Sequence, residues 1–346
     1  MTLILTLAAL GCSATRPNPV KQIFHDYRGV NTPGAAVMVI RDGRVLLKQV
    51  YGLADLERQI PVTSATNFRL ASVSKQFTAM SIMILIERGK LDYNTTLNEI
   101  FPDFPDYGRR ITIQHLLQHT SGLIDYEDLM ADTATVQVHD RDVLNMMMSV
   151  DSTYFAPGSK FSYSNSGYAV LALTVEKLSG RPYAQFLREE IFLPLGMNNT
   201  VAYEKDISTV PNRAFGYTVT ADSVRFSDQS STSAVLGDGG IYTSIDDLFH
   251  WDQVLYGDRL VSIKNLERAF TPGLNDYGFG WRIDQYKNHR RVHHTGSTCG
   301  FRNVIQRFPD ENFTVIILTN RRDPEVEPLA EALADYYLIR AETDPD

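Results

Sequence analysis

The chain has little cysteine, no long apolar run and no excess of positive charge. Its 346 residues include only 2 cysteines, so a disulfide framework cannot hold the fold together. No stretch reaches the roughly 18 apolar residues that a membrane-spanning helix needs. The net charge is −8 at pH 7, without a basic run, which argues against a nucleic-acid-binding surface. Hydrophobic residues make up 43% of the chain, which indicates a globular protein with a large core.

The first residues read as a targeting signal. The run MTLILTLAALGCSAT is apolar up to Gly11-Cys12, and a polar tether follows as far as Pro19. Residues 1–19 therefore resemble a bacterial lipoprotein signal and tether, with lipidation expected at Cys12. We expect an exported protein, periplasmic or membrane-anchored, whose membrane contact is this lipid alone. An ordinary frayed N-terminus is the alternative, because no positive residue precedes the apolar run.

Residues 70–80, LASVSKQFTAM, place Ser72 and Lys75 three positions apart at the start of an apolar helix expected over 72–88. That helix is apolar almost all round, and a buried ammonium is costly. Lys75 therefore either has a local partner or has lost its proton and acts as a base. Positions i and i+3 share a helix face, so the amine can reach the Ser72 hydroxyl. A chance pair is the alternative, since about one Ser-x-x-Lys is expected in such a chain.

The order of expected elements indicates an α+β fold. Strand patterns open the chain with a hairpin, AAVMVIRDGRVLLKQVYG, that turns at Arg41-Asp42-Gly43. They return near the end in GFGWRI, RRVHHTG, GFRNVIQRFP and FTVIILTN. Helices are expected at 20–27, 113–119, 141–150, 168–178, 183–191 and 324–341.

This order predicts an α/β sandwich with a discontinuous domain. One antiparallel sheet, built from residues 20–69 and 240–346, is flanked by helices, and a mostly helical domain of residues 70–239 is inserted into it. The cleft between two such domains is the default place for a site.

Two further stretches belong with Ser72 and Lys75. In FSYSNSGY, Tyr163 and Asn165 face the same way if the backbone there is extended, and VHHTGS ends a strand. Ser-x-x-Lys, Tyr-x-Asn and His-x-Gly in this order resemble the three motifs of serine β-lactamases and penicillin-binding DD-peptidases, in the class C β-lactamase-like branch. LLQHTSGL, PGSKFSYSN, PLGM and GDGGIYTSIDDLFHW support the likeness. It covers roughly residues 20–340 and implies a β-lactamase/transpeptidase-like fold.

The resemblance implies acyl transfer without a cofactor or metal. Ser72 would be the nucleophile and Lys75 the nearest base. Tyr163 would exchange a proton with Ser72 and then with the leaving group, and which of the two is the base in each step stays open. Asn165 would bond to Lys75 and to the substrate amide.

The third motif would bind the substrate. The backbone N–H groups of Ser72 and Ser297 would form the oxyanion hole. Gly296 would keep the strand edge open, because a side chain there would crowd the acyl group. His294 and Thr295 complete the motif, and a histidine with a pKa of about 6.5 would lend a positive charge that fades as pH rises.

The predicted activity is a serine hydrolase that forms an acyl-enzyme on D-amino-acid peptides or small esters. It resembles D-Ala-D-Ala carboxypeptidases and their esterase and D-aminopeptidase relatives, and β-lactams are possible covalent ligands. Arg282 in YGFGWRI corresponds to the arginine that holds the substrate carboxylate in secreted DD-carboxypeptidases. Arg302 is a second candidate, and a solvated strand arginine is the alternative. A class C-type β-lactamase or a non-catalytic penicillin-binding sensor are the alternative functions.

Several polar residues near the motifs are expected to be structural. His293 and His294 are neighbours in a strand, so they point to opposite faces and cannot easily hold one metal ion. Residues 119–121, His-Thr-Ser, are interpreted as a buried, hydrogen-bonded turn after a helix. Cys299 is interpreted as a small filler, and Asp238 has no assigned role.

Overall fold

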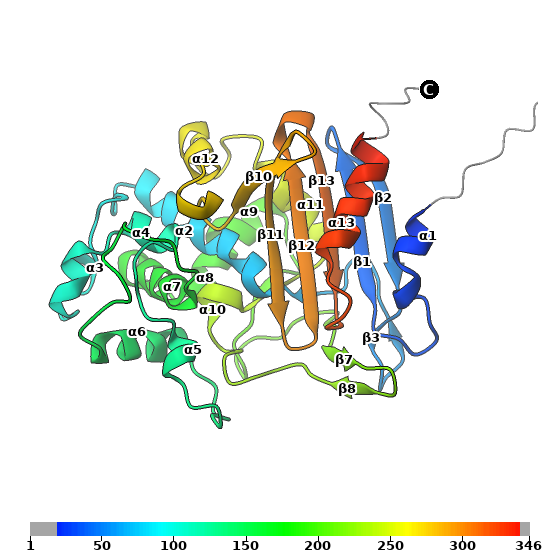
Figure 1. Cartoon of the computed structure of the whole chain (residues 1–346), viewed down its shortest axis with the longest axis horizontal. Helices are drawn as coiled ribbons and strands as arrows, with labels where there is room; N and C mark the ends of the chain where they lie inside the picture. The colour runs from blue at the N-terminus through cyan, green and yellow to red at the C-terminus, as the bar shows by residue number, and fades with distance from the viewer. Residues whose placement is uncertain (1–18, 340–346) are drawn as a thin grey trace, which may run out of the picture.

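Strands from both ends of the chain build the main sheet in the computed structural model, which describes residues 19–339 (Figure 1). The sheet is antiparallel, with the order β10-β11-β12-β13-β1-β2. Its strands are β1 (Ala35–Arg41), β2 (Arg44–Tyr51), β10 (Arg282–Tyr286), β11 (His289–Thr298), β12 (Phe301–Phe308) and β13 (Phe313–Thr319). The mostly helical segment lies between β2 and β10, so the predicted α+β fold is confirmed.

The hairpin of β1 and β2 turns where the sequence predicts. Asp42 and Gly43 have φ angles of 50° and 70°, and Arg41 pairs with Arg44 across the turn. Two left-handed residues form the turn whose twist matches that of the strands, and Asp-Gly is a favoured pair for it.

Side chains of the sheet alternate between two cores. Ala35, Val37 and Val39 pack in one core with residues of α1 (Val20–Ile23) and α13 (Glu327–Ala334). The intervening residues, Ala36, Met38 and Ile40, belong to the larger core of the helical side, and α11 (Ile245–Val254) contacts β13 and β1. Burying one of the larger apolar side chains stabilises the folded state by about 1.5–3 kcal/mol. Both faces of the sheet therefore contribute to stability.

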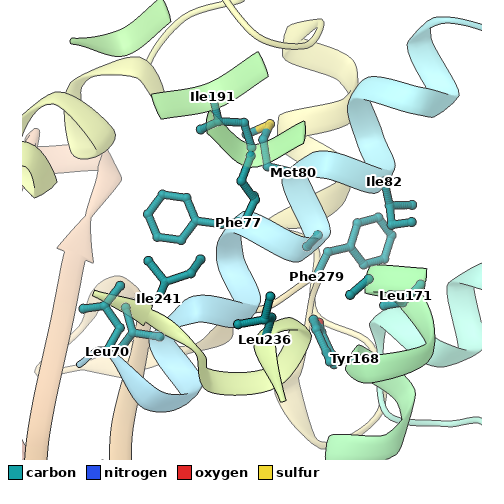
Figure 2. Packing of buried hydrophobic residues seen from close by; sticks show 14 of the residues in the cluster. Leu70, Phe77, Met80, Ile82, Tyr168, Leu171, Ile191, Leu236, Ile241 and Phe279 are labelled. Carbon is teal, nitrogen blue, oxygen red and sulfur yellow. The ribbon is translucent and has the colours of Figure 1, made fainter. Parts of the chain in front are cut away.

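The helix α2 (Lys75–Glu87) lies at the centre of the larger core. Its residues from Lys75 to Leu85 are all buried. The Phe77 ring lies 4.2 Å from that of Trp251 and 5.6 Å from that of Phe192. Figure 2 shows the side chains around it, among them Tyr168, Leu171, Leu236, Ile241 and Phe279. This packing fixes the direction in which α2 leaves Ser72.

The other helices lie, like α2, in the segment between β2 and β10. They are α3 (Leu97–Ile100), α4 (Ile113–Leu117), α5 (Tyr126–Leu129), α6 (Asp140–Ser149), α7 (Asn165–Ser179), α8 (Tyr183–Leu187), α9 (Leu193–Leu195), α10 (Leu236–Gly239) and α12 (Ile263–Ala269). Small sheets pair β3 (Leu53–Asp55) with β4 (Ile60–Pro61), β7 (Tyr217–Val219) with β8 (Val224–Phe226), and β9 (Ile241–Thr243) with β5 (Phe68–Arg69) and β6 (Val201–Ala202).

Several predicted elements differ in extent from the observed ones, and two of them contribute to the site. The strand expected over GFGWRI begins only at Arg282, because Gly280 has a φ of 76° and packs against the backbone of Lys75. The helix expected from residue 168 begins at Asn165, where the Ser164 hydroxyl accepts a hydrogen bond from the N–H of Gly167.

Three predictions are not tested by the structure. Cys12 and the signal of residues 1–19 lie, except for Pro19, outside the described residues, so lipidation and export stay predictions. The domain boundaries at 69/70 and 239/240 also stay predictions. Between residues 19 and 339, no helix is both long enough and apolar enough to cross a bilayer.

Candidate active site

Ser72 lies in a sharp turn at the start of α2. A 3₁₀ turn, Ala71–Ser74, leads from β5 into the helix. Ala71 has a φ of 50°, a left-handed conformation that few residues other than glycine adopt. The side chain of Ser72 is half-buried and lines a polar pocket of about 50 Å³ together with Asn165 and Ser297. A larger hollow of about 710 Å³, around Arg58 and Arg213, shares no residue with this pocket.

Lys75 is fully buried and is surrounded by oxygen atoms. Its Nζ lies 3.2 Å from Ser72 Oγ, 2.8 Å from Asn165 Oδ1 and 2.9 Å from the carbonyl oxygen of Asp238. Amide and carbonyl oxygens only accept, whereas a hydroxyl donates or accepts. A neutral amine can therefore donate to Asn165 and Asp238 and turn its lone pair to Ser72. Lys75 thus has the local partners that its burial requires, in a geometry that also suits a base.

Asn165 is oriented by acidic residues that the sequence did not indicate. Its Nδ2 donates to Glu127 Oε1 at 3.2 Å, which leaves Oδ1 for Lys75. Its backbone N–H donates to Asp125 Oδ2 at 2.7 Å. The backbone between Tyr163 and Asn165 is extended at Ser164, but the extended segment ends there, because Asn165 is the first residue of α7. Both side chains nevertheless lie near Lys75.

Tyr163 lies beside Lys75 with its ring centroid 5.0 Å from Nζ. Its hydroxyl is buried and has no hydrogen-bond partner among residues 19–339. The rings of His119 and His294 lie 4.2 Å and 6.3 Å from the Tyr163 ring. The second motif is therefore in contact with the first and close to the third.

The third motif lies on β11, next to the turn that holds Ser72. Pairing with β10 ends at His293, so the edge of β11 from Thr295 to Ser297 is not covered by that strand. The predicted reason for Gly296 is wrong. A Cβ there would lie 2.0 Å from the carbonyl oxygen of Leu70, so the glycine allows β11 to pack against the turn before Ser72 rather than keeping space for an acyl group.

His294 is buried and is held at both ring nitrogens. Nδ1 lies 2.6 Å from the carbonyl oxygen of Thr295, and Nε2 lies 3.0 Å from the hydroxyl of Tyr277. Burial is the main cause that lowers the pKa of His294 to about 3, and the positive charge of Arg282 adds to it. The expectation of a histidine that titrates near neutral pH is therefore wrong.

The two candidate arginines differ in their partners. The guanidinium of Arg282 lies 6.0 Å from the Tyr163 ring and 5.8 Å from the Tyr277 ring, and in the described part of the chain it makes no ion pair. Arg302 instead pairs with Glu325 at 3.2 Å and donates to the carbonyl oxygen of Phe301. Of the two, Arg282 is the cation that is close to the motifs and uncommitted.

The other polar residues have structural contacts. His293 points away from His294, toward Asp284 and Glu327 at 3.4 Å and 3.2 Å, as predicted. Cys299 is not a core filler, because it is a half-buried turn residue between β11 and β12 with a φ of 43°.

Asp238, without a predicted role, lines the Ser72 pocket and holds Lys75 through its backbone. Its Oδ2 accepts from Tyr126 at 3.1 Å, and burial raises its pKa to about 6. A backbone carbonyl carries no residue-type signal, so this contact could not be found from the sequence. Tyr277 could have been found, because it precedes Arg282 in the quoted YGFGW run.

Comparisons with known proteins identify the family of this chain. The family model "Beta-lactamase" matches residues 20–338. Penicillin-binding protein 4* of Bacillus subtilis (strain 168) is 36% identical over 88% of this chain and 72% of that protein. The chain covers 64% of protein flp of Staphylococcus aureus (strain MW2), which is 28% identical.

Solved structures share the fold. The octameric penicillin-binding protein homologue from Pyrococcus abyssi matches 91% of this chain and 75% of its own, with a TM-score of 0.79 and 25% identity. D-amino acid amidase from Ochrobactrum anthropi SV3 matches 93% of this chain and 99% of its own, with a TM-score of 0.77 and 24% identity. The fold is thus of the β-lactamase/transpeptidase type. The chain belongs to the Beta-lactamase family, with the penicillin-binding proteins, and is a serine hydrolase.

Proposed function

We propose that the protein cleaves D-amino-acid peptides that end in a free carboxylate, through an acyl-enzyme on Ser72. The observation that carries the proposal is the position of Lys75 Nζ, 3.2 Å from Ser72 Oγ and held by two oxygens that can only accept. Hydrogen-bond reach between a nucleophile and a base is the first requirement for activating a serine.

Acylation uses the groups around Ser72 in turn. Lys75 takes the hydroxyl proton as Oγ bonds to the substrate carbonyl carbon. The backbone N–H groups of Ser72 and Ser297 hold the oxyanion, and the uncovered edge of β11 supports this role. Tyr163, whose hydroxyl has no other partner in residues 19–339, passes its proton to the leaving nitrogen as the C–N bond breaks, and it regains a proton from Lys75, which carries the one taken from Ser72. Water then attacks the ester, and Ser72 regains its proton.

Arg282 supports a carboxylate-bearing substrate. Its guanidinium lies beside Tyr163 and has no ion pair within residues 19–339, whereas Arg302 is engaged by Glu325. A planar guanidinium can hold a carboxylate with two parallel hydrogen bonds. His294 faces the same region as a neutral group, so Arg282 is the cation available to a substrate anion there.

The test compares three substrates on the purified chain: a peptide ending in D-Ala-D-Ala, a neutral p-nitrophenyl ester and a fluorescent penicillin. We expect release of D-Ala, together with a penicillin adduct that is lost slowly. Rapid loss of the adduct with no peptide cleavage would instead identify a β-lactamase. Ester cleavage alone would identify an esterase, and a permanent adduct without turnover of any substrate would identify a sensor.

A further inference from the structure

His119 has an unusual backbone conformation, and its ring packs against the ring of Tyr163. It follows α4, is 1% exposed, and has a φ of 56°. Residues other than glycine, asparagine and aspartate seldom adopt this left-handed conformation. In His119 the conformation brings the ring and the backbone carbonyl to the same segment of chain, the one that carries Tyr163.

One residue therefore holds both sides of Tyr163. The backbone N–H of Ser162 donates to the carbonyl oxygen of His119 at 3.0 Å, and the N–H of Ser164 donates to His119 Nδ1 at 3.1 Å. The imidazole also lies on the Tyr163 ring, with 4.2 Å between centroids and 35° between planes. Two backbone contacts and one ring contact fix where the phenol lies.

The same ring separates the second motif from the third. Its centroid lies 4.6 Å from that of Tyr277, whose hydroxyl meets His294 Nε2. His119 thus packs between the tyrosine of Tyr-x-Asn and the tyrosine that contacts the histidine of His-x-Gly. A change in the volume of this side chain would be felt by both motifs.

The contact with Ser164 needs a neutral imidazole. Nδ1 accepts an N–H, so it carries no proton, whereas both ring nitrogens of a charged histidine are donors. Burial lowers the pKa of His119 well below its usual value, and the Arg282 guanidinium adds to this effect. Nε2 then carries the proton, and it has no hydrogen-bond partner among the described residues.

We propose that His119 is a positioning residue that fixes the Tyr163 phenol for proton transfer to the leaving nitrogen. The inference rests on the proposed function, since it requires that Tyr163 takes part in the reaction. His119 itself need not touch the substrate. Its contribution is the ring contact and the acceptor for Ser164, and both act through the placement of Tyr163.

The test is a double-mutant cycle on the full chain with a peptide ending in D-Ala-D-Ala as substrate, because Tyr163 acts on a leaving nitrogen and p-nitrophenolate would leave an ester without a proton. We expect His119→Ala to lower kcat by about 10–100-fold with little change in KM, because a displacement of about 1 Å of a reacting group can cost 10²-fold. His119→Asn tolerates the left-handed backbone and keeps an acceptor near the Nδ1 position, so it should lose less than His119→Ala. In a Tyr163→Phe background, His119→Ala should cost nothing more.

Two controls separate this role from a merely structural one. His115→Ala removes a half-buried histidine whose Nδ1 accepts a hydrogen bond from the N–H of Thr112, and it should leave kcat unchanged. Melting curves show whether each variant is folded. Parent-level kcat in His119→Ala, equal losses in His119→Ala and His119→Asn, or a His119→Ala loss that persists in Tyr163→Phe would each overturn the inference. Full activity of Tyr163→Phe alone would instead overturn the proposed role of Tyr163.

Discussion

The hydroxyl of Tyr277 lies 3.0 Å from Nε2 of His294, and the opposite ring nitrogen lies 2.6 Å from a carbonyl oxygen. A carbonyl only accepts, so Nδ1 carries the proton and Nε2 accepts from Tyr277. These are the hydrogen bonds of a neutral imidazole. A second proton would turn Nε2 into a donor and would place a charge in a buried site beside Lys75 and Arg282. The third motif therefore contains a neutral histidine.

The first prediction concerns substrate binding between pH 5.5 and 8. The pKa of His294 is lowered to about 3, so the ring stays neutral throughout this range and no positive charge is lost as pH rises. KM for a carboxylate-bearing peptide should follow the same pH dependence as KM for a neutral ester. His294→Gln, which is neutral and keeps an acceptor for Tyr277, should leave KM for the peptide within a few-fold. A KM that rises about tenfold through pH 6.5 for the peptide alone would contradict a neutral His294.

A second prediction concerns stability in acid. An unfolded histidine titrates near a pKa of about 6.5, whereas folded His294 stays neutral down to about 3. Below the unfolded pKa, the unfolded chain binds the extra proton, so stability falls as pH falls. Relative to His294→Gln, the unfolding free energy of the parent should drop by about 1.4 kcal/mol per pH unit between pH 6 and 4. Urea unfolding at several pH values measures the difference, and a constant difference would refute it.

The third prediction tests Arg282 as the carboxylate clamp. Arg282→Ala should cost ~2–5 kcal/mol of transition-state binding for a peptide that ends in D-Ala, the scale for breaking a desolvated charge pair. The neutral ester has no carboxylate to lose, so its kcat/KM should stay within a few-fold. Arg302→Ala is the matched control, because Arg302 is already paired with Glu325, and it should not discriminate between the two substrates. Equal losses on both substrates in Arg282→Ala, or none, would favour a broad esterase.

The fourth prediction concerns the contact between β11 and the turn before Ser72. A Cβ at position 296 would lie 2.0 Å from Leu70 O and 3.3 Å from Val73 Cγ2, so Gly296→Ala must push β11 away from Ser72. We expect a loss of about 1–3 kcal/mol in stability, typical of overpacking, together with a fall in kcat as Ser297 moves. Gly257→Ala is the control, because no atom lies within 4 Å of its added Cβ. Thermal melts and ester kinetics that match the parent in Gly296→Ala would show that the contact is not needed.

Much of the fold could be predicted because its signals are local. The turn at Arg41-Asp42-Gly43 follows from the order of residues, and the apolar run after Ser72 predicts a buried helix. The three motifs could be found in the same way, since each is a short run of a few residue types. The first residue of a helix is harder to predict. At Asn165 it depends on the side chain of Ser164, which caps the helix.

The rest of the site depends on contacts that no local signal carries. His119 lies 45 positions from Ser164 in the sequence. Its role depends on a left-handed backbone conformation, which the sequence HTSG does not predict. The neutrality of His294 comes from burial and from Tyr277, which lies on a separate segment. The carbonyl of Asp238 holds Lys75 across 163 positions, and any residue type could supply that atom. The residue types predict the chemistry of the site. The charge states and orientations of its side chains depend on packing between distant segments.

The most direct test of the account is the covalent state of Ser72. Intact mass measured over time with a slowly hydrolysed penicillin should show one acyl adduct on the parent chain and none on Ser72→Ala. Lys75→Ala should form the same adduct ~10²–10⁴-fold more slowly, the usual contribution of a general base, while its melting curve shows that it is folded. An adduct on Ser72→Ala, or acylation of folded Lys75→Ala at the parent rate, would contradict the account.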